Sequence, residues 1–225
     1  MLRLWGFTTT RKRKKKKKTC PTFSNQKPTV SLLQTAKLKF LLHMTRPETI
    51  VPDTPQPPYP ICHKSSIVSG FGRGSSELGI PTANIPVNDQ LNNLPTGIYY
   101  GWCKIHPHPQ QSDSTEQRPD GQDVVFNHGN KLCKTDLSTV WPMVMSIGWN
   151  PFYHNKTKAA EIHIIHKFTS DFYGADLEYV VLGYIRPELN YTTKEALIKD
   201  IELDISIAKD ILKREEYAKY EHELK

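Results

Sequence analysis

Long apolar runs are missing from this 225-residue sequence, and the longest N-terminal candidate, residues 38–42, is interrupted by Lys39. A membrane-spanning helix needs about 20 apolar residues, so stable membrane insertion is not expected. Cysteine is also scarce, with no Cys-x-x-Cys pair among Cys20, Cys62, Cys103 and Cys133. This spacing argues against a zinc knuckle or a disulfide framework and indicates a reducing compartment.

Acidic residues are missing from the first 44 positions, which carry 12 lysines and arginines. The rest of the chain has 18 basic against 23 acidic residues, so it is acidic although the formal net charge is +7. A fold that binds nucleic acid through its own surface carries the basic patch itself, so no nucleic-acid partner is expected. We interpret residues 1–60 as a disordered basic leader followed by a proline-rich lead-in over 47–60.

The leader has three open interpretations. Its hydroxyl-rich, acid-free composition resembles a mitochondrial transit peptide, and the basic run 11–18 resembles a nuclear signal or an RNA-binding arm. It can also be an appendage without a targeting role. We expect a cytoplasmic protein, with mitochondrial association through the leader as the alternative.

Short β-type runs dominate after the lead-in, each rich in β-branched or aromatic residues and bounded by turn formers. Six such runs lie at 67–70, 83–87, 97–105, 142–148, 159–168 and 179–185. Because no helical pattern intervenes, the sequence predicts one mainly β domain over 61–225, built as a six-stranded antiparallel barrel or sandwich.

A helical pattern closes the chain. Thr192 and Glu195 have the spacing of a capping box. The apolar residues that follow recur every three or four positions, at Leu197, Ile201, Ile205, Ala208 and Leu212. This period predicts a long amphipathic α-helix packed on the β domain.

Residues 106–139 separate the third run from the fourth. They are rich in Pro, Gln, Ser and Asp, too long for an ordinary hairpin turn and too polar for a core. We interpret them as a mobile insertion.

Three alternating glycines, Gly70, Gly72 and Gly74, follow the first run and flank Arg73. Glycine lets the backbone approach a ligand closely and turn its N–H groups toward phosphates. A glycine-rich hairpin without a ligand has the same pattern, so the motif alone is weak. Neither a Walker A loop nor the protein-kinase H-R-D triplet is present, which excludes those two nucleotide-binding classes.

Thr82 and Asn84 stand two positions apart on an extended segment, so their side-chain oxygens face the same side. Two neutral oxygen ligands suffice for Mg²⁺ when phosphates and water supply the rest. Without the glycine loop, the same residues are more typical of a turn with local side-chain bonds.

Glu161 interrupts an apolar strand pattern, with Ala160, Ile162 and Ile164 on the opposite face. A carboxylate within a strand is disfavoured unless it is paired or functional. The alternatives are a working glutamate and an edge-strand glutamate that lies in solvent or is paired with Lys156 or Lys158. His163 and His166 are three positions apart and point to opposite faces, which argues against a shared metal and favours structural roles.

Aromatic residues gather on both sides of this strand, at Trp149, Phe152, Tyr153, Phe172 and Tyr173. They can be core residues. Polar residues between them suggest loops instead, where exposed aromatics favour a flat ring ligand.

These segments together resemble riboflavin kinase of the eukaryotic, single-activity type. The resemblance rests on G-F-G-R-G-x-x-x-L-G-I-P-T-A-N, T-G-I-Y-Y-G-W, S-I-G-W-N-P-F-Y, E-I-H-I-I-H-x-F, D-F-Y-G and G-Y-I-R-P-E, in order from about residue 66 to 188. It implies a six-stranded Greek-key β-barrel that phosphorylates riboflavin at its 5′-hydroxyl to FMN. Riboflavin and ATP are then the ligands, Mg²⁺ is the expected metal with Zn²⁺ as the alternative, and a monomer is expected.

The resemblance also implies site residues. Glu161 is the catalytic base, and Thr82 and Asn84 help to hold the metal. The ATP and phosphate side comprises Gly70, Phe71, Gly72, Arg73, Gly74, Ser75, Phe172 and Tyr173. The flavin side comprises a flap over 151–158 and the residues Trp149, Asn150, His154, Thr157 and Arg186.

A second function class is a small β-barrel that binds single-stranded RNA. The basic leader would serve as its electrostatic arm, and Tyr99, Tyr100 and Trp102 as stacking platforms. The acidic barrel argues against it.

Overall fold

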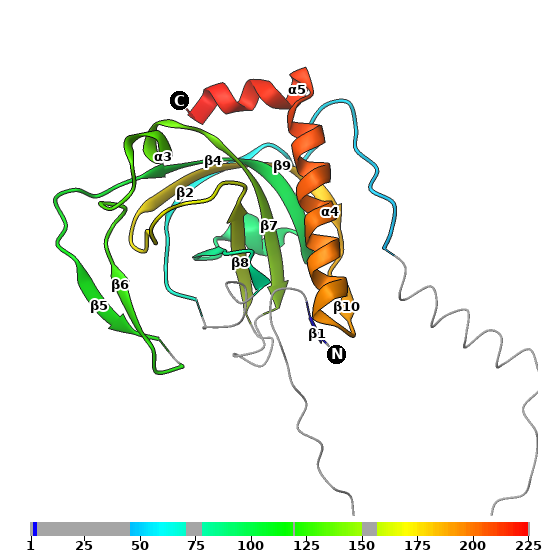
Figure 1. Cartoon of the computed structure of the whole chain (residues 1–225). Coiled ribbons are helices and arrows are strands. Elements are labelled where there is room, and N and C mark those ends of the chain that lie inside the picture. The colour runs from blue at the N-terminus through cyan, green and yellow to red at the C-terminus, as the bar shows by residue number, and fades with distance from the viewer. Residues whose placement is uncertain (1, 4–45, 71–77, 119, 150–156, 225) are drawn as a thin grey trace, which may run out of the picture.

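The computed structural model describes residues 2–3, 46–70, 78–118, 120–149 and 157–224. A curled six-stranded sheet forms its centre (Figure 1). Its strands are β2 (Ile61–Ser66), β3 (Ala83–Ile85), β4 (Gly97–His106), β7 (Trp141–Trp149), β8 (Lys158–Ile164) and β9 (Asp176–Arg186). They are ordered β2-β9-β4-β7-β8-β3, and every neighbouring pair is antiparallel. The predicted mainly β fold is confirmed, in the form of a half-barrel.

The segment after β2 brings the two edges of the sheet together. Ile67 donates a backbone hydrogen bond to Ala175 (2.8 Å), and Val68 donates one to Asn84 (2.9 Å). Residues 67–68 therefore connect the start of β9, beside the edge strand β2, with the opposite edge strand β3. The expected first strand at 67–70 was wrong in position, because the regular pairing with β9 lies earlier, over β2.

The two faces of the sheet bury separate apolar clusters. The inner cluster fills the curled side and includes Met143, Met145, Ile147 and Ile162. The outer cluster lies on the opposite face, where Val144 and Val180 pack with Leu197 and Ile201. Because side chains alternate along a strand, the long strands β4, β7 and β9 contribute to both clusters.

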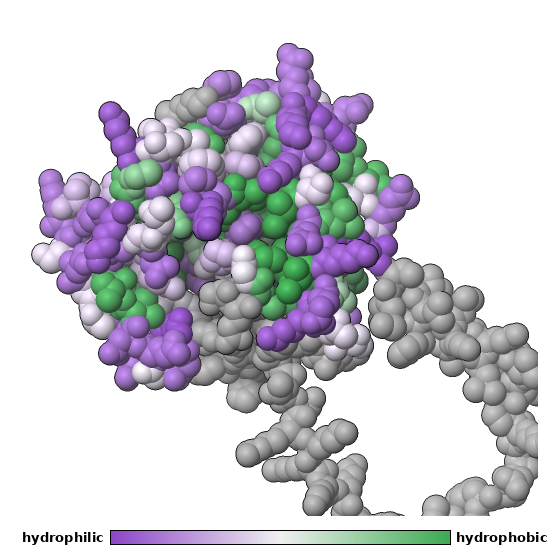
Figure 2. Space-filling view, in the orientation of Figure 1, coloured by the Kyte–Doolittle hydropathy of each residue, from purple (hydrophilic) through white to green (hydrophobic). Residues whose placement is uncertain are grey.

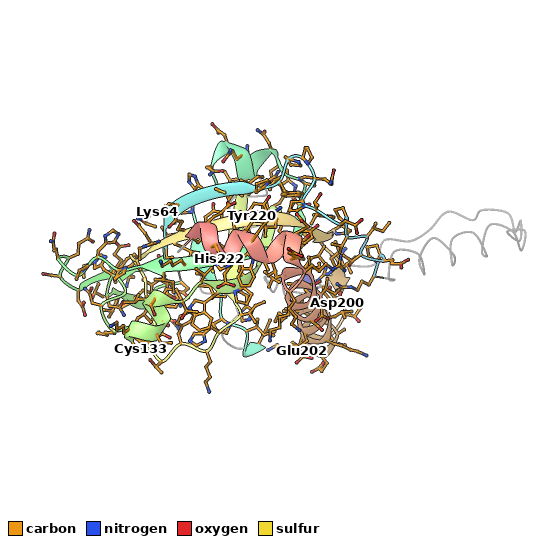
Figure 3. All side chains as sticks on the ribbon, turned by 90° about the horizontal axis from the view of Figure 1, so that it is seen from above. Lys64, Cys133, Asp200, Glu202, Tyr220 and His222 are labelled. Carbon is orange, nitrogen blue, oxygen red and sulfur yellow. The ribbon has the colours of Figure 1, made fainter. Side chains whose placement is uncertain are left out.

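The C-terminal helix covers part of the outer face. It consists of α4 (Lys194–Leu212), followed by α5 (Glu215–Ala218) and the 3-10 helix η3 (Lys219–Leu224). Seen from above, α5 and η3 lie across the sheet, with Tyr220 and His222 on η3 (Figure 3). The predicted helix is confirmed, but its N-cap is Thr193, whose side chain accepts from the Ala196 N–H (3.2 Å), rather than Thr192.

Hydrophilic side chains dominate the rim of the molecule, and hydrophobic ones show between α4 and the neighbouring strand (Figure 2). This distribution agrees with the amphipathic pattern read from the sequence. None of the helices in the described ranges is long and apolar enough to cross a membrane.

The lead-in before β2 is part of the packed structure. Tyr217 donates its hydroxyl to the Pro52 carbonyl (2.9 Å), and Tyr59 packs beside Tyr99 with ring centroids 6.4 Å apart. The fold therefore extends upstream of the expected boundary at Ile61. Of the leader, the structure describes Arg46 and β1 (Leu2–Arg3), which pairs with β10 (Asn190–Tyr191); residues 1 and 4–45 lie outside the described ranges.

The segment 106–139 has structure of its own. It contains a hairpin of β5 (Ser114–Gln117) and β6 (Asp123–Phe126), followed by α3 (Lys134–Ser138). Leu132 belongs to the inner cluster, so the expectation that this segment is too polar for the core was wrong there. Its mobility stays a prediction. A further short helix, α2 (Asp89–Asn93), is capped by Asn88 and leads into β4.

Candidate active site

A row of polar residues crosses three neighbouring strands on the outer face. Ser146 of β7 lies opposite Glu161 of β8, which lies opposite Asn84 of β3. Directly opposed residues have Cβ atoms about 4.5–5.5 Å apart and share a face. Thr82, two positions before Asn84, donates its hydroxyl to Oε2 of Glu161 (3.3 Å). The structure therefore brings together the three residues expected to serve as base and metal ligands.

Gly70 completes this row at the β3 edge. A Cβ atom at position 70 would come 2.4 Å from Nδ2 of Asn84, so a larger residue would displace the Asn84 side chain. The start of the glycine-rich segment thus lies directly against the polar row. Its other predicted phosphate-binding residues lie outside the described ranges: Phe71, Gly72, Arg73, Gly74 and Ser75.

His163 fixes the segment that carries Thr82. Its Nδ1 lies 2.8 Å from the Pro81 carbonyl oxygen. Burial lowers the pKa of His163, which favours the neutral ring, although the bond to Pro81 opposes that shift. His166 points elsewhere, since it stacks on Trp141 (3.7 Å between centroids) and bonds Asp136 (2.9 Å). The structural roles predicted for both histidines agree with these contacts.

The expected flavin side begins at the end of β7. Trp149 is 45% exposed, and the Lys158 ammonium lies 5.5 Å from the centre of its ring. Lys158 also donates to the carbonyls of Asn92 (2.6 Å) and Leu94 (2.7 Å), which ties β8 to α2. Thr157 is exposed, whereas the predicted residues Asn150 and His154 lie outside the described ranges.

Phe172 and Tyr173, expected on the nucleotide side, lie on the turn before β9. Phe172 packs edge-on against Phe168 (4.8 Å), and Tyr173 lies beside Phe126 of the hairpin (5.8 Å). Burial, with the nearby Asp171 carboxylate, raises the pKa of Tyr173. Both rings are partly buried against the inner cluster. The Glu161 row lies on the opposite, outer face of the sheet.

Arg186 has partners that differ from those expected. Its guanidinium is 0% exposed and forms paired bonds with Asp204 of α4, Nε to Oδ1 at 3.0 Å and Nη2 to Oδ2 at 2.6 Å. Arg46 also donates to Asp204 (2.7 Å) and to Asp200. A side chain that is enclosed and saturated in this way anchors the helix. Direct contact of its guanidinium with a flavin is therefore a poor fit to this structure.

Two residues of this face were missed by the sequence reading. Ser146 is buried directly opposite Glu161, yet a serine within an apolar strand gives no distinctive signal. Glu188 places its carboxylate over β7, where a Cβ atom at Gly148 would come 2.4 Å from Oε1. The only sequence signal for Glu188 is its place in the G-Y-I-R-P-E block.

The polar row suits an oxygen-preferring metal better than zinc. Thr82 and Asn84 offer a hydroxyl and an amide oxygen, and Glu161 offers a carboxylate beside them. No cluster of three or more His, Cys, Asp or Glu side chains within the described residues can hold a metal ion. Mg²⁺ that is bound together with phosphates takes few protein ligands, and these are oxygen atoms.

Two of the three stacking platforms of the RNA-binding alternative are not available on the surface. Tyr99 and Tyr100 are 0% and 1% exposed, so they are core residues. Trp102 donates its indole N–H to the Tyr217 carbonyl (3.1 Å) beneath the C-terminal segment. Bases could not stack on the two tyrosine rings without unfolding the structure.

The half-barrel carries a helix over one part of its outer face, and a carboxylate, a hydroxyl and an amide gather on the other part. This arrangement is the framework of a small β-barrel enzyme. Comparisons with known proteins agree. Residues 57–212 match the family model described as "Flavokinase: Riboflavin kinase".

Curated relatives match at high identity. The riboflavin kinase of Lodderomyces elongisporus is 70% identical over 182 residues, covering 80% of this chain and 100% of that protein. The riboflavin kinase of Scheffersomyces stipitis is 63% identical over 177 residues, covering 79% and 98%. This chain belongs to the riboflavin kinase family, and the prediction of a kinase of this family is confirmed.

A solved structure supports the fold. The crystal structure of riboflavin kinase from Trypanosoma brucei matches with a TM-score of 0.51 and 24% identity, covering 74% of this chain and 88% of that one. At this identity the likeness concerns the fold alone.

Proposed function

We propose that this protein transfers the γ-phosphoryl group of ATP to the 5′-hydroxyl of riboflavin, which yields FMN and ADP. The observation that carries the proposal is the meeting of Glu161, Thr82 and Asn84 on one sheet face beside Gly70. Membership of the riboflavin kinase family supports the choice of reaction.

Glu161 acts as the general base. A primary alcohol is a poor nucleophile at neutral pH, and a carboxylate within hydrogen-bond reach orients it and accepts its proton as the oxygen attacks phosphorus. Glu161 stands within β8, with strands on both sides, so its backbone is held in place. The Thr82 hydroxyl bond restricts the carboxylate further.

Thr82 and Asn84 would hold Mg²⁺ together with the ATP phosphates, with Zn²⁺ as the less suitable ion. When bound, the metal would neutralise charge on the phosphates. His163 keeps the Thr82 segment in register through its bond to Pro81, and Gly70 leaves room for the Asn84 side chain.

The two substrates approach this row from different sides. ATP lies along the segment from Gly70 to Ser75, with Phe172 and Tyr173 on its side. Riboflavin lies toward Trp149 and Thr157, with Asn150 and His154 from the adjoining flap. The exposed Trp149 ring supports this choice, because a flat ring system gains from contact with an accessible aromatic face.

Incubation of the purified full chain with riboflavin, ATP and Mg²⁺, followed by chromatography of the flavins, tests the reaction. FMN should form only when all three are present. Failure to form FMN, by a protein that gives a cooperative melt, would contradict the proposed function.

A magnesium titration tests the metal assignment. Thr82→Val keeps the shape and removes the oxygen, so this variant should need far more Mg²⁺ or lose turnover, while riboflavin binding weakens less. Thr115→Val on the exposed strand β5 is the matched control and should behave as the unmodified protein. A magnesium titration of Thr82→Val that overlays the control is inconsistent with ligation.

A further inference from the structure

The outer face carries a second carboxylate, on Glu188, that the proposed mechanism does not use. Glu188 follows β9 and is half-buried. A Cβ atom at position 148 would come 2.4 Å from its Oε1 and 3.2 Å from its Cδ. The carboxylate therefore lies directly on the backbone of β7, in space that exists only because residue 148 is glycine.

This carboxylate shares its face with Glu161. Gly148 lies two positions after Ser146 on β7, and Ser146 is directly opposite Glu161. Residues two apart on a strand point to the same side and are about 7 Å apart along it. Glu188 thus sits on the face of the catalytic row, displaced along the strands toward Trp149.

Contacts of the neighbouring Arg186 restrict the position of Glu188. Arg186, two residues earlier, donates from Nη1 to the Pro187 carbonyl (3.1 Å) and is held by Asp204 of α4. Arg186 and Asp204 are 0% and 1% exposed. The buried Arg186–Asp204 pair holds the turn after β9 and so restricts the position of Glu188. A restricted side chain loses less conformational entropy when it binds a ligand.

We propose that Glu188 determines specificity for the polyol chain of the substrate. This inference rests on the proposed function. Glu161 engages the terminal hydroxyl, and Glu188, one step further along the same face, accepts hydrogen bonds from the secondary hydroxyls of the chain. An ionised carboxylate is an acceptor with about four lone-pair sites, which suits adjacent hydroxyl donors.

Two flavin substrates separate this role from a structural one. Riboflavin carries three secondary hydroxyls that are absent from a flavin with a 5-hydroxypentyl chain on the same ring nitrogen, and both keep the terminal hydroxyl. Glu188→Ala should lower kcat/KM for riboflavin about tenfold or more, since hydrogen bonds to charged groups contribute strongly. The kcat/KM for the hydroxypentyl flavin should change little, so the preference for riboflavin should collapse.

Controls keep the outcome clear. Glu116→Ala, on the exposed strand β5, should leave both values unchanged. The KM for ATP should stay the same in Glu188→Ala, whereas general damage to the fold would lower activity toward both flavins. If Glu188→Ala does not give a cooperative melt, Glu188→Gln keeps the bulk and should shift the preference in the same direction by less.

An unchanged preference in the folded Glu188 variants would overturn the inference while leaving the proposed function intact. Absence of FMN formation by the unmodified protein would overturn both. FMN formation by the unmodified protein therefore distinguishes failure of this inference from failure of the proposed function.

Discussion

The outer face of the half-barrel has two halves, which differ in whether their charged side chains are enclosed or accessible. Where α4 covers the sheet, Arg186 of β9 and Asp204 of α4 are enclosed and paired with each other. Beyond α4, Glu161 is half-buried next to Thr82, in a row that ends at Gly70. The covered half neutralises its charges within the protein, and the other half keeps polar groups where a ligand can reach them.

The physical basis of this difference is desolvation. A charge under a helix loses its water, so it must be paired and hydrogen-bonded to persist. Arg46 adds a second cation to the covered half and balances Asp200 and Asp204. The covered half therefore contributes mainly to stability and to the placement of α4, and we propose that the open half serves the chemistry.

Removing Asp204 should have the largest effect on stability. Asp204→Ala leaves Arg186 buried without its paired acceptor, and breaking a buried pair in this way costs about 3–5 kcal/mol of unfolding free energy. Urea denaturation measures the loss. Asp210→Ala, an exposed position on the same helix, is the control and should change little. Equal midpoints for the two variants would contradict the assignment of the covered half.

Removing Arg46 should have a smaller effect. Arg46→Ala removes bonds to Asp200 and Asp204 but leaves the pair with Arg186, so we expect a loss of about 1–3 kcal/mol. A double-mutant cycle with Asp204→Ala should give a coupling free energy larger than the deviation of about 0.3–0.5 kcal/mol that independent sites show. Strict additivity would show that Arg46 acts independently of this network.

His163 should make stability depend on pH. Burial lowers its pKa, so on acidification below about 6.5 the unfolded chain binds a proton that the folded chain does not. Stability is then highest above pH 6.5 and falls as the pH drops through this range toward the folded pKa. The melting temperature of His163→Gln should fall less steeply between pH 7 and pH 5 than that of the unmodified protein; parallel curves would contradict this.

Deleting residues 1–43 should have the smallest effect. The deletion keeps Arg46 and every residue of the polar row. Of the deleted residues, the structure describes Leu2 and Arg3, which pair with β10. Turnover of riboflavin should stay as in the full chain. A large loss in a truncated protein that still melts cooperatively would connect the leader to catalysis.

The sequence predicted those parts of the fold that alternation specifies. Along β8, Ala160, Ile162 and Ile164 alternate with Glu161, and the structure buries the first three in the inner cluster. The same rule placed Thr82 and Asn84 on one side of an extended segment. The pairing of β3 with β8 in register then brings Asn84 opposite Glu161, a contact that the prediction for each single strand did not specify.

The sequence did not predict features set by distant contacts. Strand β2 contains polar residues at most positions, and its pairing with β9 alone defines it as a strand. Arg186 was assigned to the flavin side from the family resemblance, and no local pattern shows that Asp204, 18 residues later, bonds to it from α4. The hairpin within 106–139 was missed for a similar reason, since its buried residues Val124 and Phe126 are only two among many polar ones.

The most direct test of the central claim is the turnover of Glu161→Gln, measured beside its unfolding free energy. The substitution is nearly isosteric and removes the basic oxygen, so turnover at saturating substrates should fall by about 10²–10⁴ while stability and the KM values change little. Normal turnover in the folded variant would remove Glu161 from the mechanism and contradict the division of the outer face into a structural and a catalytic half.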